Sequence, residues 1–170
     1  MLPLFDKNLS RVSREHYITG KSSINFPLGD ETGGWHFMSY YDKDNGIFKV
    51  SLSGIHFPDT HDFLGDEGVV DVAELMIKRG IKISQAHIYM ADHYRAAADM
   101  VIRWALSDSK NCNVEVSEWF PKPVDQFKLY SFIFKAKQKL QEVGKWTKVD
   151  CWMRSQKELE SRGIENNISS

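Results

Sequence analysis

Apolar and polar positions alternate along one stretch of the chain and repeat with a helical period over much of the rest. The alternating stretch is residues 35–53, where Phe48 and Val50 are separated by polar residues and the preceding arm is rich in aromatic side chains. Alternation with a period of two is typical of a strand with one buried face. Asn45 and Gly46 supply the left-handed backbone that a tight turn needs. The pattern predicts an antiparallel β-hairpin over residues 35–53, turning at this pair.

Two longer segments carry apolar residues at helical spacing, and they predict the main helices. These are residues 84–107 and residues 123–143, the second of which begins at a proline and stops before a glycine. Ile133 lies in one apolar stripe of the second helix and Phe134 lies in another. We expect Ile133 at the centre of the core, with Ile102 and Phe134 also buried.

Shorter patterns predict the remaining elements. Residues 69–79 repeat apolar positions at helical spacing, with Asp66 as a plausible N-cap and a glycine directly after the segment. Residues 113–120 and 146–153 alternate and predict two further strands. Residues 156–162 predict a short polar helix.

The predicted fold class is α+β. An antiparallel or mixed sheet starts with the hairpin and packs against the two long helices, because a hairpin followed by mixed elements favours α+β over a doubly wound sheet. Residues 1–33 contain several glycines and prolines and predict an irregular N-terminal region. Residues 164–170 predict a frayed tail. With no repeat and no linker, residues 1–170 predict a single globular domain.

Four charged residues follow one another on one side of the first long helix. They are Asp92, Arg95, Asp99 and Arg103, which stand three or four positions apart with alternating sign. Such ladders are usually solvated helix faces, which is the interpretation that we adopt. The alternative is a buried polar network within a site.

Composition limits the class of protein. The chain has 170 residues, of which 42% are hydrophobic and 12% aromatic, so a large core needs no metal or disulfide to support it. The N-terminus lacks the pattern of a secretion signal, and no apolar run is long enough to cross a membrane. Cys112 and Cys151 form no paired motif and fall at core-facing positions of the predicted strands. We therefore expect a cytoplasmic protein in which both cysteines are reduced.

Charge is distributed unevenly, although the net charge is only −1. Residues 27–75 hold ten acids and two lysines, whereas residues 121–157 hold nine bases and three acids. Such asymmetry can mark an interaction surface. Alternatively, the two halves face each other in the fold and neutralise.

The loop after the hairpin offers the densest set of metal-ligating residue types. His56, Asp59, His61 and Asp62 are candidate ligands for a divalent metal such as zinc or manganese, since imidazole and carboxylate groups bind both ions. A bound ion would lower the pKa of a coordinated water, and Glu67 is the candidate general base that would act on it. The simpler alternative is a polar loop whose carboxylates close turns and cap the next helix.

Residues 19–23 read Thr-Gly-Lys-Ser-Ser and end like a phosphate-binding loop. That motif has a glycine five positions before Gly20, where this chain has Glu15, and an apolar strand leads into it. Neither requirement is met, so we exclude a nucleotide site of that type.

Basic residues are interleaved with aromatic residues in the C-terminal half. Lysines can neutralise phosphates and exposed aromatic rings can stack on unpaired bases, so this half could contact nucleic acid. The chain as a whole is not basic, which argues against a dedicated nucleic-acid binder. The candidate contact residues are Lys128, Lys135, Lys139, Lys145, Lys148 and Arg154.

The sequence favours a small binding or regulatory module, because it contains no convincing catalytic set. Its partner would be another protein or a second copy of the chain. The first alternative is a metal-dependent hydrolase that uses the loop from His56 to Asp62. The second alternative is a nucleic-acid-associated protein.

Overall fold

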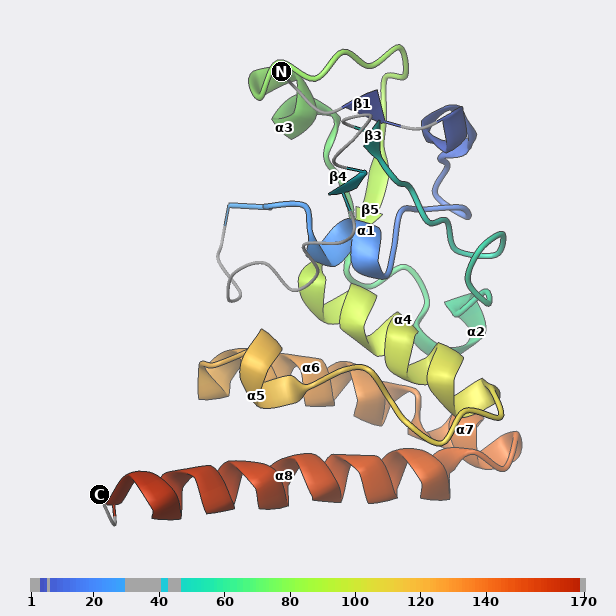
Figure 1. Cartoon of the computed structure of the whole chain (residues 1–170). Coiled ribbons are helices and arrows are strands. Elements are labelled where there is room, and N and C mark those ends of the chain that lie inside the picture. The colour runs from blue at the N-terminus through green and yellow to red at the C-terminus, as the bar shows by residue number, and fades with distance from the viewer. Residues whose placement is uncertain (1–3, 6, 30–40, 43–46, 169–170) are drawn as a thin grey trace.

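The computed structural model describes residues 4–5, 7–29, 41–42 and 47–168 and has an α+β fold (Figure 1). The long helix α4 (His93–Leu106) lies between two layers: the β-sheets and short helices on one side, and the C-terminal helices on the other. Within these ranges, no helix combines the length and apolar composition that crossing a membrane requires. The other helices are η1 (Lys7–Arg11), α1 (Lys21–Ile24), α2 (His61–Leu64), α3 (Ala73–Lys78), α5 (Val116–Trp119), α6 (Pro123–Lys135), α7 (Lys137–Glu142) and α8 (Trp146–Ile168).

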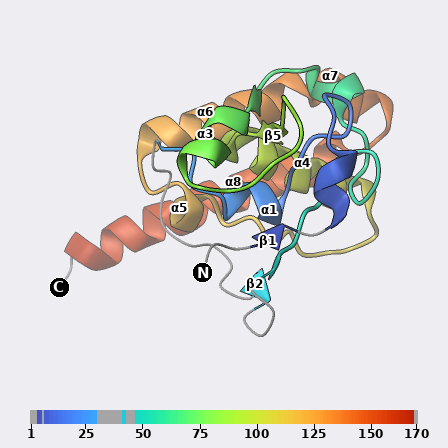
Figure 2. The ribbon, with the colours of Figure 1, turned by 90° about the horizontal axis from the view of Figure 1, so that it is seen from above.

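The described strands form two small sheets. In the first, β3 (Ile47–Phe48) is central, with β1 (Leu4–Phe5) parallel to it and β2 (Tyr41–Asp42) antiparallel. In the second, β4 (Val69–Asp71) pairs antiparallel with β5 (Tyr89–Ala91). Figure 2, seen from above, shows α8 extending past the rest of the fold toward the C-terminus.

Ile18 joins distant parts of the chain through its backbone. Its N–H donates to Tyr89 O at 2.9 Å, and its carbonyl accepts from Ala91 N at 2.8 Å. On its other side, it forms an antiparallel bridge with Leu52. Ile18, its neighbours Tyr17 and Thr19, and Leu52 are fully buried, so this part of the N-terminal segment is internal to the fold.

The described part of the predicted hairpin is paired as expected. Tyr41 lies opposite Phe48 and Asp42 lies opposite Ile47 in antiparallel register. The turn at Asn45 and Gly46, and most of the first arm, lie outside the described residues. The second strand ends earlier than predicted, at Phe48, and the chain then continues as an irregular segment into the core.

Two predicted helices begin later than expected, because the first residues of each predicted segment form a strand. The predicted helix over 84–107 begins only at His93, because Tyr89–Ala91 pairs as β5. The predicted helix over 69–79 begins as β4, and α3 starts at Ala73. Asp66 was predicted as the N-cap, but Val72 occupies that position, and the first helical N–H, that of Ala73, donates to Asp71 Oδ1 at 3.0 Å.

The strands predicted over 113–120 and 146–153 were also wrong, since residues 116–119 form α5 and residues 146–153 lie in α8. Among the side chains of α8 that the structure describes, Val149, Trp152 and Met153 are buried, and they stand at helical spacing. A short apolar run fits either period, so alternation alone could not separate the two. Cys151, expected to face the core, is exposed as a result. The helix also continues through 156–162 and into the predicted tail, as far as Ile168.

The C-terminal core follows the predicted stripe on α6 and α7. The predicted helix over 123–143 is interrupted at Ala136 and ends before Gly144, which has a φ of 70°. Ile133 and Ile102 are both 1% exposed, as predicted, and pack in one cluster. Phe134 was predicted to be buried but is 50% exposed. Only one of the two apolar stripes is therefore covered.

The ladder on α4 is not a solvated face, because its two central members are buried. Arg95 is fully buried and Asp99 is 1% exposed. A guanidinium has five N–H donors, and here each has a partner. Nε donates to Asp99 Oδ1 at 3.0 Å, and Nη1 donates to the carbonyls of Gly65 at 2.8 Å and Glu67 at 2.6 Å. Arg95 therefore attaches the loop before β4 to α4.

The rest of this network reaches the N-terminal segment. Arg95 Nη2 donates to Tyr17 Oη at 2.9 Å and to Thr60 Oγ1 at 3.1 Å. Asp99 accepts from the hydroxyls of Tyr17 at 2.8 Å, and of Thr19 and Thr60 at 2.7 Å each. Burial, followed by the nearby Asp99 carboxylate, raises the pKa of Tyr17 to about 12, so the phenol remains a donor. These five side chains and the two carbonyls are called the Arg95 network below.

The covered stripe can be tested by comparing two neighbouring residues. Ile133→Ala removes a buried side chain from the centre of a core cluster and should lower the free energy of unfolding by about 2–5 kcal/mol. Phe134→Ala, one residue away and half exposed, should lower it by less than about 1 kcal/mol. Urea denaturation measures both, and equal losses would contradict the assigned helix faces.

The Arg95 network can be tested against a surface pair of the same spacing. Asp99→Asn keeps the size of the side chain but leaves a buried guanidinium without a countercharge, so we expect a loss of about 3–5 kcal/mol. The control is Asp150→Asn, because Asp150 pairs with Arg154 at 3.0 Å on exposed α8 and should contribute less than about 1 kcal/mol. A small effect of Asp99→Asn in the same denaturation assay would show that the charge pair does not support the fold.

Candidate functional site

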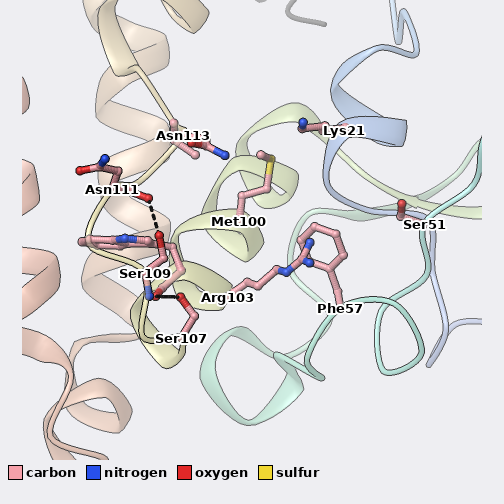
Figure 3. Close-up of a pocket in the computed structure, with 11 residues that line it drawn as sticks. Lys21, Ser51, Phe57, Met100, Arg103, Ser107, Ser109, Asn111 and Asn113 are labelled. Carbon is pink, nitrogen blue, oxygen red and sulfur yellow. Dashed lines mark hydrogen bonds between the residues drawn. The ribbon is translucent and has the colours of Figure 1, made fainter. Parts of the chain in front are cut away.

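An open cavity of about 490 Å³ lies along α4. Its walls come from four separate parts of the chain: α1, the segment before α2, α4 and the loop after α4 (Figure 3). This volume falls in the usual range for small-molecule sites. The lining residues are Lys21, Ser51, Phe57, Met100, Arg103, Trp104, Ser107, Ser109, Asn111, Asn113 and Val114.

Helix α4 contributes the floor of the cavity. Met100, Arg103 and Trp104 stand three and four positions apart, so they share one side of the helix. Figure 3 shows Arg103 extending from α4 to the ring of Phe57. Its guanidinium carbon lies 4.4 Å from the ring centroid, which is within the range of a cation–π contact.

Phe57 is fixed in this position by its contact with Gly20. A Cβ atom placed on Gly20 would lie 2.4 Å from Cζ of the Phe57 ring, so the ring would have to shift. Gly20 also has a φ of 65°, a conformation that L-residues rarely adopt. The ring therefore rests directly on the backbone just before Lys21, and this contact shapes the wall that faces Arg103.

Hydrogen bonds hold the loop on the opposite side. The Ser107 hydroxyl donates to Trp104 O at 2.8 Å and accepts from Ser109 N at 3.2 Å. Lys148 of α8 donates to Trp104 O at 3.0 Å and to Ser107 O at 2.8 Å, which caps the C-terminal end of α4. The loop is thereby attached both to α4 and to α8.

The electrostatic character of the cavity is positive. Among its described lining residues, Lys21 and Arg103 are cations and none is Asp, Glu, His or Cys. Arg103 forms no ion pair with any described residue, and its contact is the Phe57 ring. The lining thus suits an anion with a flat apolar part, and it offers no general base or metal ligand.

The loop residues predicted to hold a metal lie outside this cavity. His61 is bound on both sides, with Nδ1 at 2.7 Å from Asp59 Oδ1 and Nε2 at 3.2 Å from Asp66 Oδ1. The backbone N–H of His61 also donates to Asp59, and this bond is the main reason that the pKa of Asp59 is lowered. The two carboxylates therefore meet opposite edges of one ring and do not converge on a point.

The other members of the predicted set are used elsewhere or stand apart. His56 Nδ1 accepts from Leu52 N at 3.0 Å, within its own turn. The carboxylate of Glu67, the candidate general base, binds Lys135 of α6. Asp62 lies exposed in α2. Over the part of the chain that the structure describes, no three His, Cys, Asp or Glu residues are arranged to hold a metal ion.

Most of the predicted nucleic-acid contact residues are engaged within the protein. Lys128 lies over the Tyr94 ring at 5.1 Å, and Lys135 binds Glu67. Lys148 caps α4 as described, and Lys145 is half-buried at the start of α8. The remaining two, Lys139 and Arg154, pair with Glu142 and Asp150 on their own helices.

Neither cysteine has the features of a reactive group. Cys112 is partly buried and Cys151 is exposed, and both are free of disulfide bonds. Burial raises the pKa of the Cys112 thiol to about 11, so the thiolate is scarce at neutral pH.

Sequence reasoning missed the cavity. Lys21 belongs to the Thr-Gly-Lys-Ser-Ser segment, which was excluded as a nucleotide loop, and Arg103 was assigned to a solvated face. The only local signal was the glycine before Lys21, which the contact with Phe57 now explains. Comparison with known proteins gives no further guide, because no family model, no curated protein and no solved structure matches the chain.

The contact between Gly20 and Phe57 can be tested with a matched glycine. Gly65 has nearly the same backbone conformation as Gly20, with φ 58° and ψ −148° against φ 65° and ψ −140°, but nothing lies within 4 Å of its added Cβ. Both substitutions to alanine add backbone strain, whereas only Gly20→Ala displaces a ring. We expect Gly20→Ala to cost about 1–3 kcal/mol more than Gly65→Ala in thermal or urea unfolding. Equal costs would show that Phe57 does not depend on the glycine.

Proposed function

We propose that the protein is a small cytoplasmic binding module that takes a small organic anion with a flat apolar body into this cavity. The main supporting observation is Arg103, an exposed guanidinium held over Phe57 in a cavity whose described lining contains a second cation and no acid. An arginine with no carboxylate partner among the described residues is well suited to bind a carboxylate or a phosphate through two parallel hydrogen bonds.

The apolar part of the lining supports the rest of the proposed ligand. Phe57, Met100 and Trp104 offer aromatic and thioether surface beside the cation, and Asn111 and Asn113 add polar groups at the rim. Small-molecule sites commonly combine an apolar lining with a few placed polar groups. A ligand here would contact α4, α1 and the loop after α4 together, so binding would stabilise their arrangement.

The alternative functions receive less support from the geometry. A metal-dependent hydrolase would need ligands that converge, whereas His56 and His61 take part in separate hydrogen bonds. Nucleic-acid binding would need available cations, and most of the candidate lysines already have partners.

The proposal is tested by titrating benzoate and adenosine monophosphate, with neutral benzamide as the control ligand. We expect one of the anions to bind with a dissociation constant below about 1 mM and benzamide to bind at least tenfold more weakly. Arg103→Met should weaken anion binding at least about tenfold, since it removes the guanidinium but keeps a side chain over Phe57. Calorimetry gives the affinities, and amide chemical shifts give the location.

The matched control is Arg154→Met, because Arg154 is an exposed arginine on α8 outside the cavity. Its affinity for the anion should equal that of the unmodified protein. The proposal fails if neither anion binds, or if Arg103→Met and Arg154→Met bind it equally well.

A further inference from the structure

A second surface stands out on α6, on the side away from the core. Val124, Phe127 and Phe134 are 58%, 72% and 50% exposed. Tyr130 is partly buried between them, and the ring of Phe134 lies 5.8 Å from that of Trp146, which extends the apolar surface onto α8. We call these five residues the aromatic strip.

The strip is continuous because of helical geometry. Positions 124, 127, 131 and 134 lie on one face of α6, three or four residues apart. On this face, Ser131 lies between Phe127 and Phe134, and its hydroxyl donates to Phe127 O at 2.8 Å. Its polar group is thus bound to the helix itself. An apolar face therefore runs along most of α6, opposite the stripe that carries Ile133.

A row of exposed aromatic residues is unusual on a surface that contacts only solvent. Single apolar side chains on a surface need no explanation, whereas a contiguous group rimmed by charge marks an interaction site. Phe127 is the most exposed of the large apolar residues in the described chain.

The rim of the strip is basic. Lys137 lies 5.3 Å from the Trp146 ring centroid, and Lys157 lies 5.3 Å from that of Tyr130. Residues 122–139 contain five lysines and a single acid, Asp125. Lys135 and Lys139 pair with Glu67 and Glu142, whereas the other three lysines form no ion pair with a described residue. Asp125 is buried and accepts from the Tyr94 hydroxyl at 2.6 Å, so it does not offset the charge at the surface.

We propose that the aromatic strip docks an acidic amphipathic helix of a partner protein. The apolar face of such a helix would cover Phe127 and Phe134, and its carboxylates would meet the surrounding lysines. This mode of recognition uses anchors at helical spacing on both partners. Because aromatic side chains carry much of the energy in such contacts, Phe127 is the expected main anchor.

Charge distinguishes this partner from a second copy of the chain. Two α6 helices related by a two-fold axis would place the same basic residues against each other, which opposes self-association through this face. Nucleic acid is also an anion, and the competition experiment below distinguishes it from an acidic helix.

The proposed docking site is separate from the cavity. None of the strip residues lines the cavity, and Phe57, Arg103 and Lys21 are not part of the strip. Loss of anion binding and loss of helix docking are therefore independent results.

The test uses the full chain and a synthetic, fluorescein-labelled helical peptide with leucine at every third or fourth position and glutamate elsewhere. Fluorescence anisotropy should show binding at micromolar concentration, and amide shifts should change along residues 124–137. Affinity should fall as salt rises, since lysines contribute to it. A peptide with lysine in place of glutamate should bind at least about tenfold more weakly.

Two variants of the strip and one matched control complete the test. Phe127→Asp and Val124→Asp should each weaken binding at least about tenfold without changing the melting temperature, because both side chains are exposed. Ile77→Asp, at a 61% exposed apolar residue on α3, should leave binding unchanged. The proposal is overturned if the three variants behave alike or if the lysine peptide binds equally well. It is also overturned if polyuridylate or anionic vesicles compete for the same residues more strongly than the acidic peptide.

Discussion

The buried pair of Arg95 and Asp99 is the constraint on which the remaining structure depends. Two charges without water are costly, and only complete hydrogen bonding offsets that cost. Here every N–H of the guanidinium has a partner, and three hydroxyls donate to the carboxylate. Those partners come from the N-terminal segment and from residues 60–67, far from α4 in the sequence. The charge pair therefore determines where these segments meet the helix.

The same constraint places both cations of the cavity. Arg103 stands one turn of α4 beyond Asp99, in the row that begins at Arg95, and it points out of the protein where that row leaves the core. Lys21 follows Thr19, whose hydroxyl is bound to Asp99 at 2.7 Å. Gly68 lets the loop before β4 pass close to α4, since a Cβ on Gly68 would lie 2.7 Å from Cβ of Arg95. The Arg95 network thus positions the candidate site, although none of the network's side chains lines the cavity.

Local sequence patterns predicted those features of the fold that depend on residues close together in the sequence. The stop of α7 before Gly144 and the burial of Ile133 followed from helical spacing and a glycine. The segment around Val149 was assigned to a strand because alternation and helical spacing coincide over so few residues. The partners of Arg95 could not be predicted, since Tyr17 and Thr60 lie 78 and 35 positions away. A cavity lined by four segments has no local signature for the same reason.

The uneven charge of the chain left two alternatives, and the contacts distinguish them. If the acidic and basic halves neutralised each other, their side chains would pair across the fold. Instead, Asp59 and Asp66 bind His61 within residues 27–75, and Asp71 binds at 2.6 Å to His87, which belongs to neither half. Among the described residues, Glu67 with Lys135 is the ion pair that joins the two halves. Among the described residues, Lys122, Lys128 and Lys137 form no ion pair, so part of the positive charge of α6 and its flanks is not neutralised by folding, and an exposed apolar face lies beside it. Apolar contact would supply affinity there, and the sign of the charge selects an acidic partner.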